Sequence, residues 1–218
     1  ENNLNRISSV IAGGYQNAIL TNSDYSVTGG GRQNASDSHY SAIGGGYLNT
    51  NPASCGDQNI ITGGYSNTLV AASTYNYGSV LGGYDNSIQG SRCVVAGGYS
   101  NDITHVAGAR YTNIGGGYAN DITASYVVTV VGGYSNSIVG NYDYVGGGKD
   151  NHITATEGYS TICGGKDNSI TLHYRHVILG GLGNSITSYQ STNLGGTGNT
   201  NRYTWSTTIG AYADTDHG

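Results

Sequence analysis

The stretch VVAGGYSNDI, residues 94–103, recurs in altered form along the chain and decides its fold. Close variants are VIAGGYQNAI at 10–19, IITGGYSNTL at 60–69, SVLGGYDNSI at 79–88 and TVVGGYSNSI at 129–138. Apolar and polar residues alternate before the Gly-Gly pair and again after the asparagine, which is the period of a β-strand. Each copy therefore predicts two short strands joined at Gly-Gly, which together form one coil of a β-solenoid.

The asparagine in each copy marks the phase of the repeat. Successive asparagines lie 15 to 19 residues apart, and a degenerate thirteenth copy, IGAYAD, occupies 209–214. The sequence thus predicts an all-β fold, a parallel β-roll of about thirteen two-strand coils in a single domain over residues 1–218. We expect the stacked amides to form a structural ladder of hydrogen bonds. The marker asparagines are Asn17, Asn34, Asn49, Asn67, Asn86, Asn101, Asn120, Asn136, Asn151, Asn168, Asn184 and Asn199.

Other positions of the repeat are also constant in type. Ile or Val stands six residues before the marker in ten copies, and Ile or Leu stands two after it in nine, which predicts an inward-facing core. Gly-Gly stands four and three residues before the marker in twelve copies. We expect that corner to need positive φ or a close backbone approach that a Cβ would block. The three to seven residues that vary in number predict an insertable loop at the other corner.

Composition excludes several classes of protein. The 218 residues include 38 Gly and 20 Tyr, no Phe or Met, and one Pro, which fits neither a thick apolar core nor a collagen or disordered chain. The net charge is −5 and basic residues stand singly, so we expect no nucleic-acid partner. No apolar run approaches ~20 residues, so we expect no membrane insertion. Cys55, Cys93 and Cys163 are too scattered for a disulfide framework and are predicted to be small apolar fillers.

Aromatic residues recur at two positions of the repeat. Rings stacked at the inter-strand spacing stiffen a sheet, and they can also contact another copy or bind sugar rings. The first column, two residues before the marker, is the candidate assembly or ligand face and contains Tyr15, Tyr47, Tyr65, Tyr84, Tyr99, Tyr118, Tyr134 and Tyr212. The second column, nine residues before the marker, contains Tyr25, Tyr40, Tyr77, Tyr111, Tyr142, Tyr159 and Trp205.

Basic residues replace tyrosine in the first column at Arg32, Lys149 and Lys166. Lys149 and Lys166 are each followed by aspartate, in two successive copies of GGKDN. Stacking places lysine beside lysine, with opposite charges adjacent within each coil. We expect a solvated charge patch there rather than a binding site.

An apolar column stands seven residues before the marker, on the face opposite the predicted core. A strand that is apolar on both faces is usually buried on both, so we expect a partner along the coils, at a trimer axis or in a fibre. The alternative is that Val and Thr simply suit an exposed strand. The candidate partner-facing residues are Val10, Val27, Ile60, Val94 and Val177.

The phrases YSAIGGGYLN at 40–49 and YSTICGGKDN at 159–168 resemble the head repeats of trimeric autotransporter adhesins and similar Gly-Gly-Asn repeats of bacterial and viral fibre proteins. The resemblance implies a left-handed parallel β-roll in a homotrimer displayed outside the cell. YSNSIVG at 134–140 is also similar to the xxNxVxG repeats of ice-binding grass antifreeze proteins, although the sequence has no regular outward Thr ladder. Calcium-binding RTX repeats begin with Gly-Gly as well, but here Asn stands where Asp would neutralise Ca²⁺, so no cofactor or metal is expected.

Catalysis is not predicted. The chain has two Glu, and its six His, namely His39, His105, His152, His173, His176 and His217, occupy different phases of the repeat. No nucleophile, base and orienting group, and no metal cluster, can be assembled from such spacing. Asn34 begins the one N-x-S/T sequon, NAS, so it is a candidate for N-glycosylation.

These patterns predict a structural subunit of a self-assembling extracellular fibre or surface appendage. The repeat runs in phase nearly to both ends of the sequence, so open strand edges are expected to join copies end to end, and the lack of any Met suggests a processed or excised chain. Localisation is expected to be extracellular, on a cell surface or on a virion. The alternative is an adhesin or viral fibre head, a homotrimer that binds a receptor or glycan, and an ice-binding β-roll is a more distant one.

Overall fold

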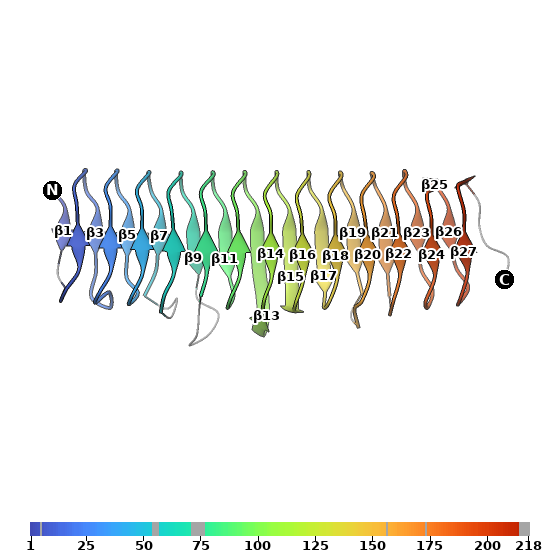
Figure 1. Ribbon diagram of the computed structural model, residues 1–218, viewed down its shortest axis with the longest axis horizontal. Coiled ribbons are helices and arrows are strands. Elements are labelled where there is room, and N and C mark those ends of the chain that lie inside the picture. The colour runs from blue at the N-terminus through green and yellow to red at the C-terminus, as the bar shows by residue number, and fades with distance from the viewer. Residues whose placement is uncertain (5, 54–56, 71–76, 156, 173, 214–218) are drawn as a thin grey trace. The chain divides into compact units, whose positions relative to one another are not determined.

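The computed structural model is an all-β parallel β-solenoid of about 12 turns, as the repeat predicts. It describes residues 1–4, 6–53, 57–70, 77–155, 157–172 and 174–213, and none of these forms a helix. The chain divides into two compact units, Glu1–Tyr111 and Thr112–Gly218, each of which is described by itself. Within each unit the coils stack side by side (Figure 1).

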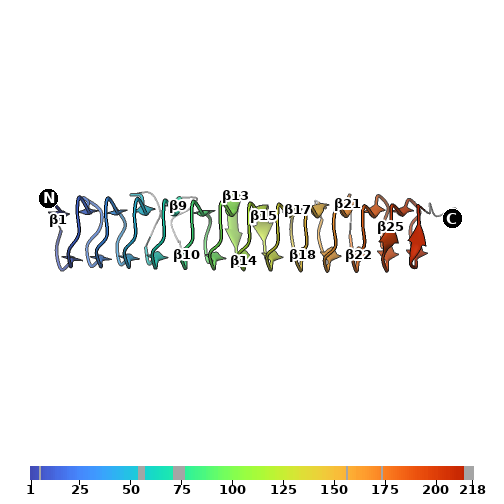
Figure 2. The ribbon, with the colours of Figure 1, turned by 90° about the horizontal axis from the view of Figure 1, so that it is seen from above.

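Each unit has two parallel sheets. Sheet A contains the strands that follow the marker asparagines, and sheet B contains those that precede Gly-Gly; they lie on opposite sides of the coils (Figure 2). In the first unit, sheet A comprises β1 (Asn3–Leu4), β3 (Ala18–Ile19), β5 (Ala35–Ser36), β7 (Thr50–Asn51), β9 (Thr68–Val70), β11 (Ser87–Gln89) and β13 (Asp102–Arg110). Its sheet B comprises β2 (Val10–Ile11), β4 (Val27–Thr28), β6 (Ala42–Ile43), β8 (Ile60–Ile61), β10 (Ser79–Val80) and β12 (Val94–Val95).

The second unit repeats the arrangement. Its sheet A comprises β15 (Asp121–Tyr126), β17 (Ser137–Gly140), β19 (His152–Thr154), β21 (Ser169–Thr171), β23 (Ser185–Ile186) and β26 (Thr200–Asn201). Its sheet B comprises β14 (Asn113–Ile114), β16 (Thr129–Val130), β18 (Tyr144–Val145), β20 (Thr161–Ile162), β22 (Val177–Ile178), β24 (Thr192–Asn193) and β27 (Thr207–Thr208). A short pair, β25 (Gly196–Thr197) and β28 (Ala211–Tyr212), lies at the Gly-Gly corner.

The register brings equivalent residues of successive coils together. In the first unit Val80 pairs with Val95, and Ile88 pairs with Ile103. Because strands in a parallel sheet lie ~4.8 Å apart, each phase of the repeat becomes a column of like side chains. The repeat in the sequence therefore places equivalent side chains next to one another along each unit.

The core is a narrow double row of β-branched and leucine side chains between the two sheets. In the first unit sheet A contributes Ile19, Leu69, Ile88 and Ile103, all of which are buried, as predicted. Sheet B of that unit contributes Ile43, Ile61, Val80 and Val95. The second unit buries Ile114, Ile122, Val130, Ile138, Val145, Ile153, Ile162, Ile170, Ile178 and Ile186 in the same way.

The Gly-Gly corner has positive φ at its second glycine in every described coil, and at its first glycine in several coils, such as Gly82 at 137° and Gly97 at 145°. Gly64 has φ +94°, and a Cβ there would collide with the carbonyl oxygen of Gly83 and lie 2.6 Å from Asn67 Nδ2. A Cβ on the preceding Gly63 would meet nothing nearer than 3.9 Å. The prediction for the corner is therefore confirmed for the second glycine, where positive φ and close approach coincide, but not for Gly63.

The marker asparagines form the predicted ladder inside this corner. The side-chain amide of Asn49 donates to Oδ1 of Asn34 at 3.0 Å, and the backbone N–H of Asn49 donates to the same oxygen at 3.0 Å. The amide of Asn49 also lies 2.9 Å from Gly45 O and 3.0 Å from Gly64 O. Each asparagine thus ties three successive coils together, and every marker from Asn17 to Asn199 is fully buried.

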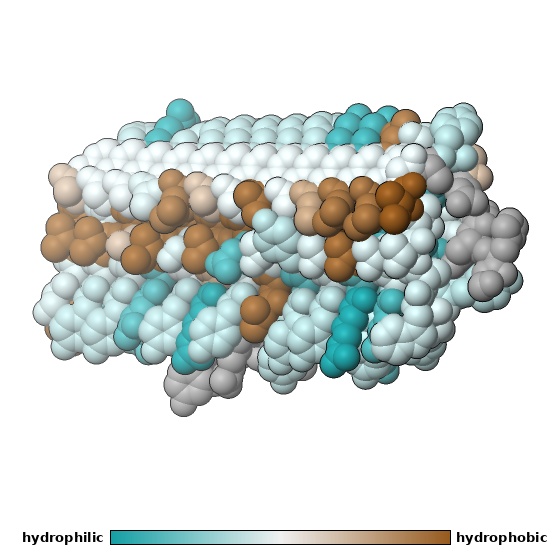
Figure 3. Space-filling view, turned by 45° about the vertical axis from the view of Figure 1, so that its right-hand side comes forward, coloured by the Kyte–Doolittle hydropathy of each residue, from teal (hydrophilic) through white to brown (hydrophobic). Residues whose placement is uncertain are grey.

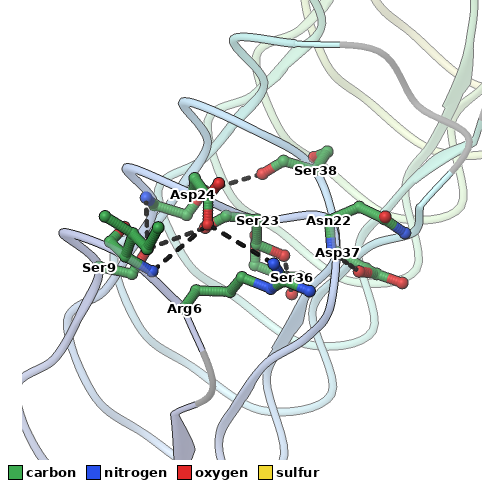
Figure 4. A network of polar contacts seen from close by, with 10 residues as sticks. Arg6, Ser9, Asn22, Ser23, Asp24, Ser36, Asp37 and Ser38 are labelled. Carbon is green, nitrogen blue, oxygen red and sulfur yellow. Dashed lines mark hydrogen bonds and ion pairs between the residues drawn. The ribbon is translucent and has the colours of Figure 1, made fainter.

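A second polar ladder lies at the variable corner, eight residues before the marker. In the first unit, Ser9 Oγ accepts the backbone N–H of Ser26 at 3.1 Å, and Ser26 Oγ accepts that of Ser41 at 3.2 Å. Nearby, the hydroxyls of Ser9 and Ser23 donate to the carbonyls of Ser23 and Ser36, each at 2.8 Å (Figure 4). The sequence analysis did not predict this ladder, although serine recurs at its phase.

Candidate functional site

The first tyrosine column forms an exposed ring ladder beside the Gly-Gly corner. In the first unit Tyr65 and Tyr84 stack at 4.6 Å with an interplanar angle of 1°, and Tyr84 and Tyr99 stack at 4.8 Å and 3°. In the second unit Tyr118 and Tyr134 stack at 4.8 Å and 3°. Desolvation by packing, then the neighbouring Tyr65 and Tyr99, raises the pKa of Tyr84.

The rest of the first column is less regular. Tyr47 meets Tyr65 edge-on, at 5.1 Å and 65°. Tyr15 is exposed, and Tyr212 is the most exposed tyrosine of the column at 83%. The rings are thus stacked face to face from Tyr65 to Tyr99 in the first unit and at Tyr118 and Tyr134 in the second.

Basic residues extend the first ladder instead of interrupting it. The guanidinium of Arg32 lies between the rings of Tyr15 and Tyr47, 5.6 Å and 5.3 Å from their centroids. Arg32 is exposed, and its planar cation takes the place of a ring in the π-stack.

Lys149 and Lys166 each form an ion pair with the adjacent aspartate, as predicted. Lys149 Nζ lies 3.8 Å from Asp150 Oδ2, and Lys166 Nζ lies 3.3 Å from Asp167 Oδ2. Lys149 also lies over the ring of Tyr134 at 4.9 Å. All four charged side chains are exposed, so their ion pairs contribute little to stability.

The second aromatic column follows the variable corner. Six of its members have left-handed backbone conformations, which were not predicted: Tyr25 at φ 61°, Tyr40, Tyr111, Tyr142, Tyr159 and Trp205. Tyr25 and Tyr40 stack at 5.2 Å and 3°, and Tyr142 and Tyr159 stack at 5.0 Å and 4°. Trp205, at the same phase, is 74% exposed.

Arginine replaces tyrosine in this column too. Arg92 lies between Tyr77 and Tyr111, 5.7 Å and 5.3 Å from their ring centroids. Its Nη1 donates a hydrogen bond to the Tyr111 hydroxyl at 3.0 Å. Arg32 and Arg92, the two arginines of the aromatic columns in the first unit, therefore each lie between two tyrosine rings.

The outer face of sheet B has no charged residue at any of its outward positions in either unit. The predicted column lies there: Val10, Val27 and Ile60 are exposed, and Val94 and Val177 are half-buried. Two residues further along each strand stands another outward column that the sequence analysis missed. Its large apolar members are Leu81, Val131, Leu179, Leu194 and Ile209, and hydrophobic side chains gather in rows along this side beside rows of small residues (Figure 3).

The outer face of sheet A is different in character. Its outward positions include charged groups, among them Asp37, Asp102, Asp121 and Arg202. The second unit also has a partial Thr column, in which Thr154 pairs with Thr171 but Thr123 pairs with Val139. Val139 interrupts this column, so it is not a regular outward Thr ladder.

A pocket of about 260 Å³ opens at the variable corner of the second unit. Tyr159, Tyr174, Arg175 and Gln190 line it. The hydroxyl of Tyr174 is hydrogen-bonded to the carboxylate of Glu157, and this bond is the first cause of the raised pKa of Tyr174. The sequence offered one signal for this place, which is the replacement of column tyrosines by Arg175 and Gln190 in successive coils.

Titratable and thiol groups are scattered over the fold. Among the described residues no three His, Cys, Asp or Glu side chains come together as metal ligands would. His176 is buried, where its Nδ1 accepts the Ser191 N–H at 3.3 Å and its Nε2 lies 3.0 Å from Leu172 O. His173, His217, Cys55 and the degenerate marker Asp214 lie outside the described residues.

The two described cysteines differ. Cys93 is buried and fits the prediction of an apolar filler, whereas Cys163 is exposed on the outer face of sheet B, which corrects it. In the part of the chain that the structure describes, no helix could cross a bilayer.

No model of a known protein family and no curated protein sequence matches the chain.

Proposed function

We propose that the chain is a structural subunit of an extracellular fibre or surface appendage, and that copies associate through the outer faces of sheet B. The observation that supports this most strongly is the absence of charge from every outward position of that sheet. Charged residues make up a tenth of the chain, yet those that the structure describes lie at the corners, on sheet A and inside, and none lies on this face.

The chemistry of the face favours association. Its exposed side chains include Leu81 at 52%, Leu179 at 49% and Ile209 at 72%. Burying such side chains removes apolar surface from water, and no charge has to be desolvated. Hydrophobic surface in rows of this kind marks interaction sites in other soluble proteins.

The occupant we propose is a second copy of the chain. The outward columns repeat once per coil, so a surface with the same repeat can align its own columns with them over several coils. A second copy of this chain has the same spacing because it is built from the same coils. The number of copies, and whether they form a closed trimer or an open fibre, is decided by the experiment below.

Cys163 provides a probe inside the proposed interface. In a Cys55→Ser background, the rate of maleimide labelling at Cys163 is measured over a range of protein concentrations, with the buried Cys93 as an internal low-reactivity reference. Sedimentation velocity on the same samples gives the oligomer mass. We expect labelling to slow as the mass rises; association that leaves the labelling rate unchanged would place the interface elsewhere.

An adhesin role is the second candidate. The exposed rings of the tyrosine columns and the corner pocket support it, since binding sites for small ligands are concave and partly aromatic. A chain that stays monomeric at all concentrations and is retained by immobilised glycans would favour this role over the structural one.

A further inference from the structure

The second aromatic column changes character in the second unit. Tyr142 and Tyr159 stack in the regular way, but the next two coils place Arg175 and Gln190 at the same phase. Tyr174 stands one residue before Arg175, so an aromatic ring is retained but displaced from the ladder. The pocket of about 260 Å³ lies at this break.

Arg175 is unlike the other arginines of the aromatic columns. Arg32 and Arg92 each lie between two tyrosine rings. The guanidinium of Arg175 makes no ring contact, ion pair or side-chain hydrogen bond with any described residue. Its five N–H donors are thus not engaged by any described residue, and they lie beside a pocket whose own lining is mostly apolar.

The other walls are held in place. The ring of Tyr159 is fixed by its stack on Tyr142 at 5.0 Å. The Tyr174 hydroxyl is held by Glu157, and the backbone N–H of Gln190 donates to Tyr174 O at 3.2 Å. The backbone N–H of Arg175 donates to Gly158 O at 3.3 Å. A site whose walls are already positioned loses less entropy on binding than a flexible one.

We propose that this pocket binds a uronic acid unit of an acidic polysaccharide. Tyrosine rings offer apolar faces on which the C–H face of a sugar ring packs, the Gln190 amide can both donate to and accept from hydroxyls, and the Arg175 fork matches a carboxylate. The volume is slightly below the ~300 Å³ lower limit of pockets for drug-sized ligands, which suits one sugar ring. The carboxylate of Glu157 lies beside the site and accepts a hydrogen bond from the Tyr174 hydroxyl.

The test is calorimetric titration of the full chain with trigalacturonic acid, with galactotriose as the neutral probe. We expect binding of the acidic trisaccharide that weakens with added salt, and at least about tenfold weaker binding of the neutral one. Arg175→Gln should weaken binding of the acidic probe about tenfold, and Tyr159→Ala should weaken binding of both probes.

Arg92→Gln is the matched control, because Arg92 occupies the same phase of the repeat but lies between two rings. It should leave the affinity within about twofold. Absence of binding of the acidic probe, equal affinity for the two probes, or equal loss with Arg92→Gln and Arg175→Gln would overturn the proposal. The titration is repeated in a Leu81→Lys background, so that its result does not depend on whether copies associate through sheet B.

Discussion

Asn136 donates both its backbone N–H and its side-chain amide to one atom, Oδ1 of Asn120, at 3.0 Å and 3.1 Å. Asn151 repeats this geometry on Asn136 in the next coil. Each amide therefore accepts from one neighbour and donates to the other, so the dipoles align along the column and strengthen one another. The ladder is the polar counterpart of the Ile and Val core.

Asn136→Asp tests the ladder with almost no change in shape. The carboxylate cannot donate, and it would face Gly132 O and Gly148 O, which the amide now contacts at 2.9 Å and 3.1 Å. We expect the free energy of unfolding to fall by about 3 kcal/mol or more at neutral pH, and by less in acid, where the carboxyl is protonated. Guanidinium denaturation followed by circular dichroism measures it. Asn22→Asp, at an exposed position outside sheet B, is the control, and an equal loss in both variants would contradict the role of the ladder.

Gly64 and Gly63 form a matched pair of adjacent residues. Gly64→Ala introduces a Cβ at φ +94° against the Gly83 carbonyl, so we expect a loss of about 3 kcal/mol or more. Gly63→Ala meets nothing nearer than 3.9 Å, so we expect a change within about 1 kcal/mol. Thermal unfolding of the two variants compares them directly. Similar melting temperatures would mean that the corner tolerates either side chain.

Asp143 should make the stability of the second unit depend on pH. Burial raises its pKa from 3.8 to about 7, although Oδ1 accepts the Ser160 N–H. Because the folded chain holds the proton more tightly than the unfolded chain, this group favours folding below about pH 4. Its contribution is lost as the pH rises toward 7, and the total change is on the order of 4 kcal/mol.

The variant that tests this is Asp143→Asn. Asn59 at the same phase already accepts the Gly78 N–H through its Oδ1 at 3.0 Å, so asparagine fits the ladder. The variant should be more stable than the native chain at about pH 8 and lack its loss of stability between about pH 4 and pH 7. Asp150→Asn, at an exposed site, should retain that pH dependence. An unchanged profile in Asp143→Asn would show that another group causes it.

The sequence predicts those features that recur at a fixed phase. The inward Ile and Val positions and the asparagine ladder follow from strand period and from the donor and acceptor groups of the amide, and both are present. Features that depend on the irregular corner were missed. The position of Arg92 between two rings, the pocket beside Arg175 and the buried carboxyl of Asp143 arise where loop length and residue type change from coil to coil. The repeat pattern therefore does not predict the structure of the variable corner in an individual coil.

The exposure of Cys163 and the second apolar column were missed for another reason. The sheet B strands end at the core position, such as Val80 in β10, yet the next residue still pairs with the neighbouring coil, since the Leu81 N–H donates to Val95 O at 3.0 Å. Alternation continued for one more residue would have placed Leu81 and Leu179 on the outer face of sheet B. The sequence therefore predicted the fold more completely than it predicted the outer face of sheet B.

The central claim, association through sheet B, is tested most directly by two leucines of the first unit. Leu81 is 52% exposed on sheet B and Leu20 is 37% exposed on sheet A, so lysine is tolerated by the fold at either position. The measurement is the sedimentation-velocity mass of Leu81→Lys, Leu20→Lys and the native chain at matched concentrations. We predict that Leu20→Lys associates as the native chain does and that Leu81→Lys remains a monomer. Equal association of both variants, or none by the native chain, would contradict the account.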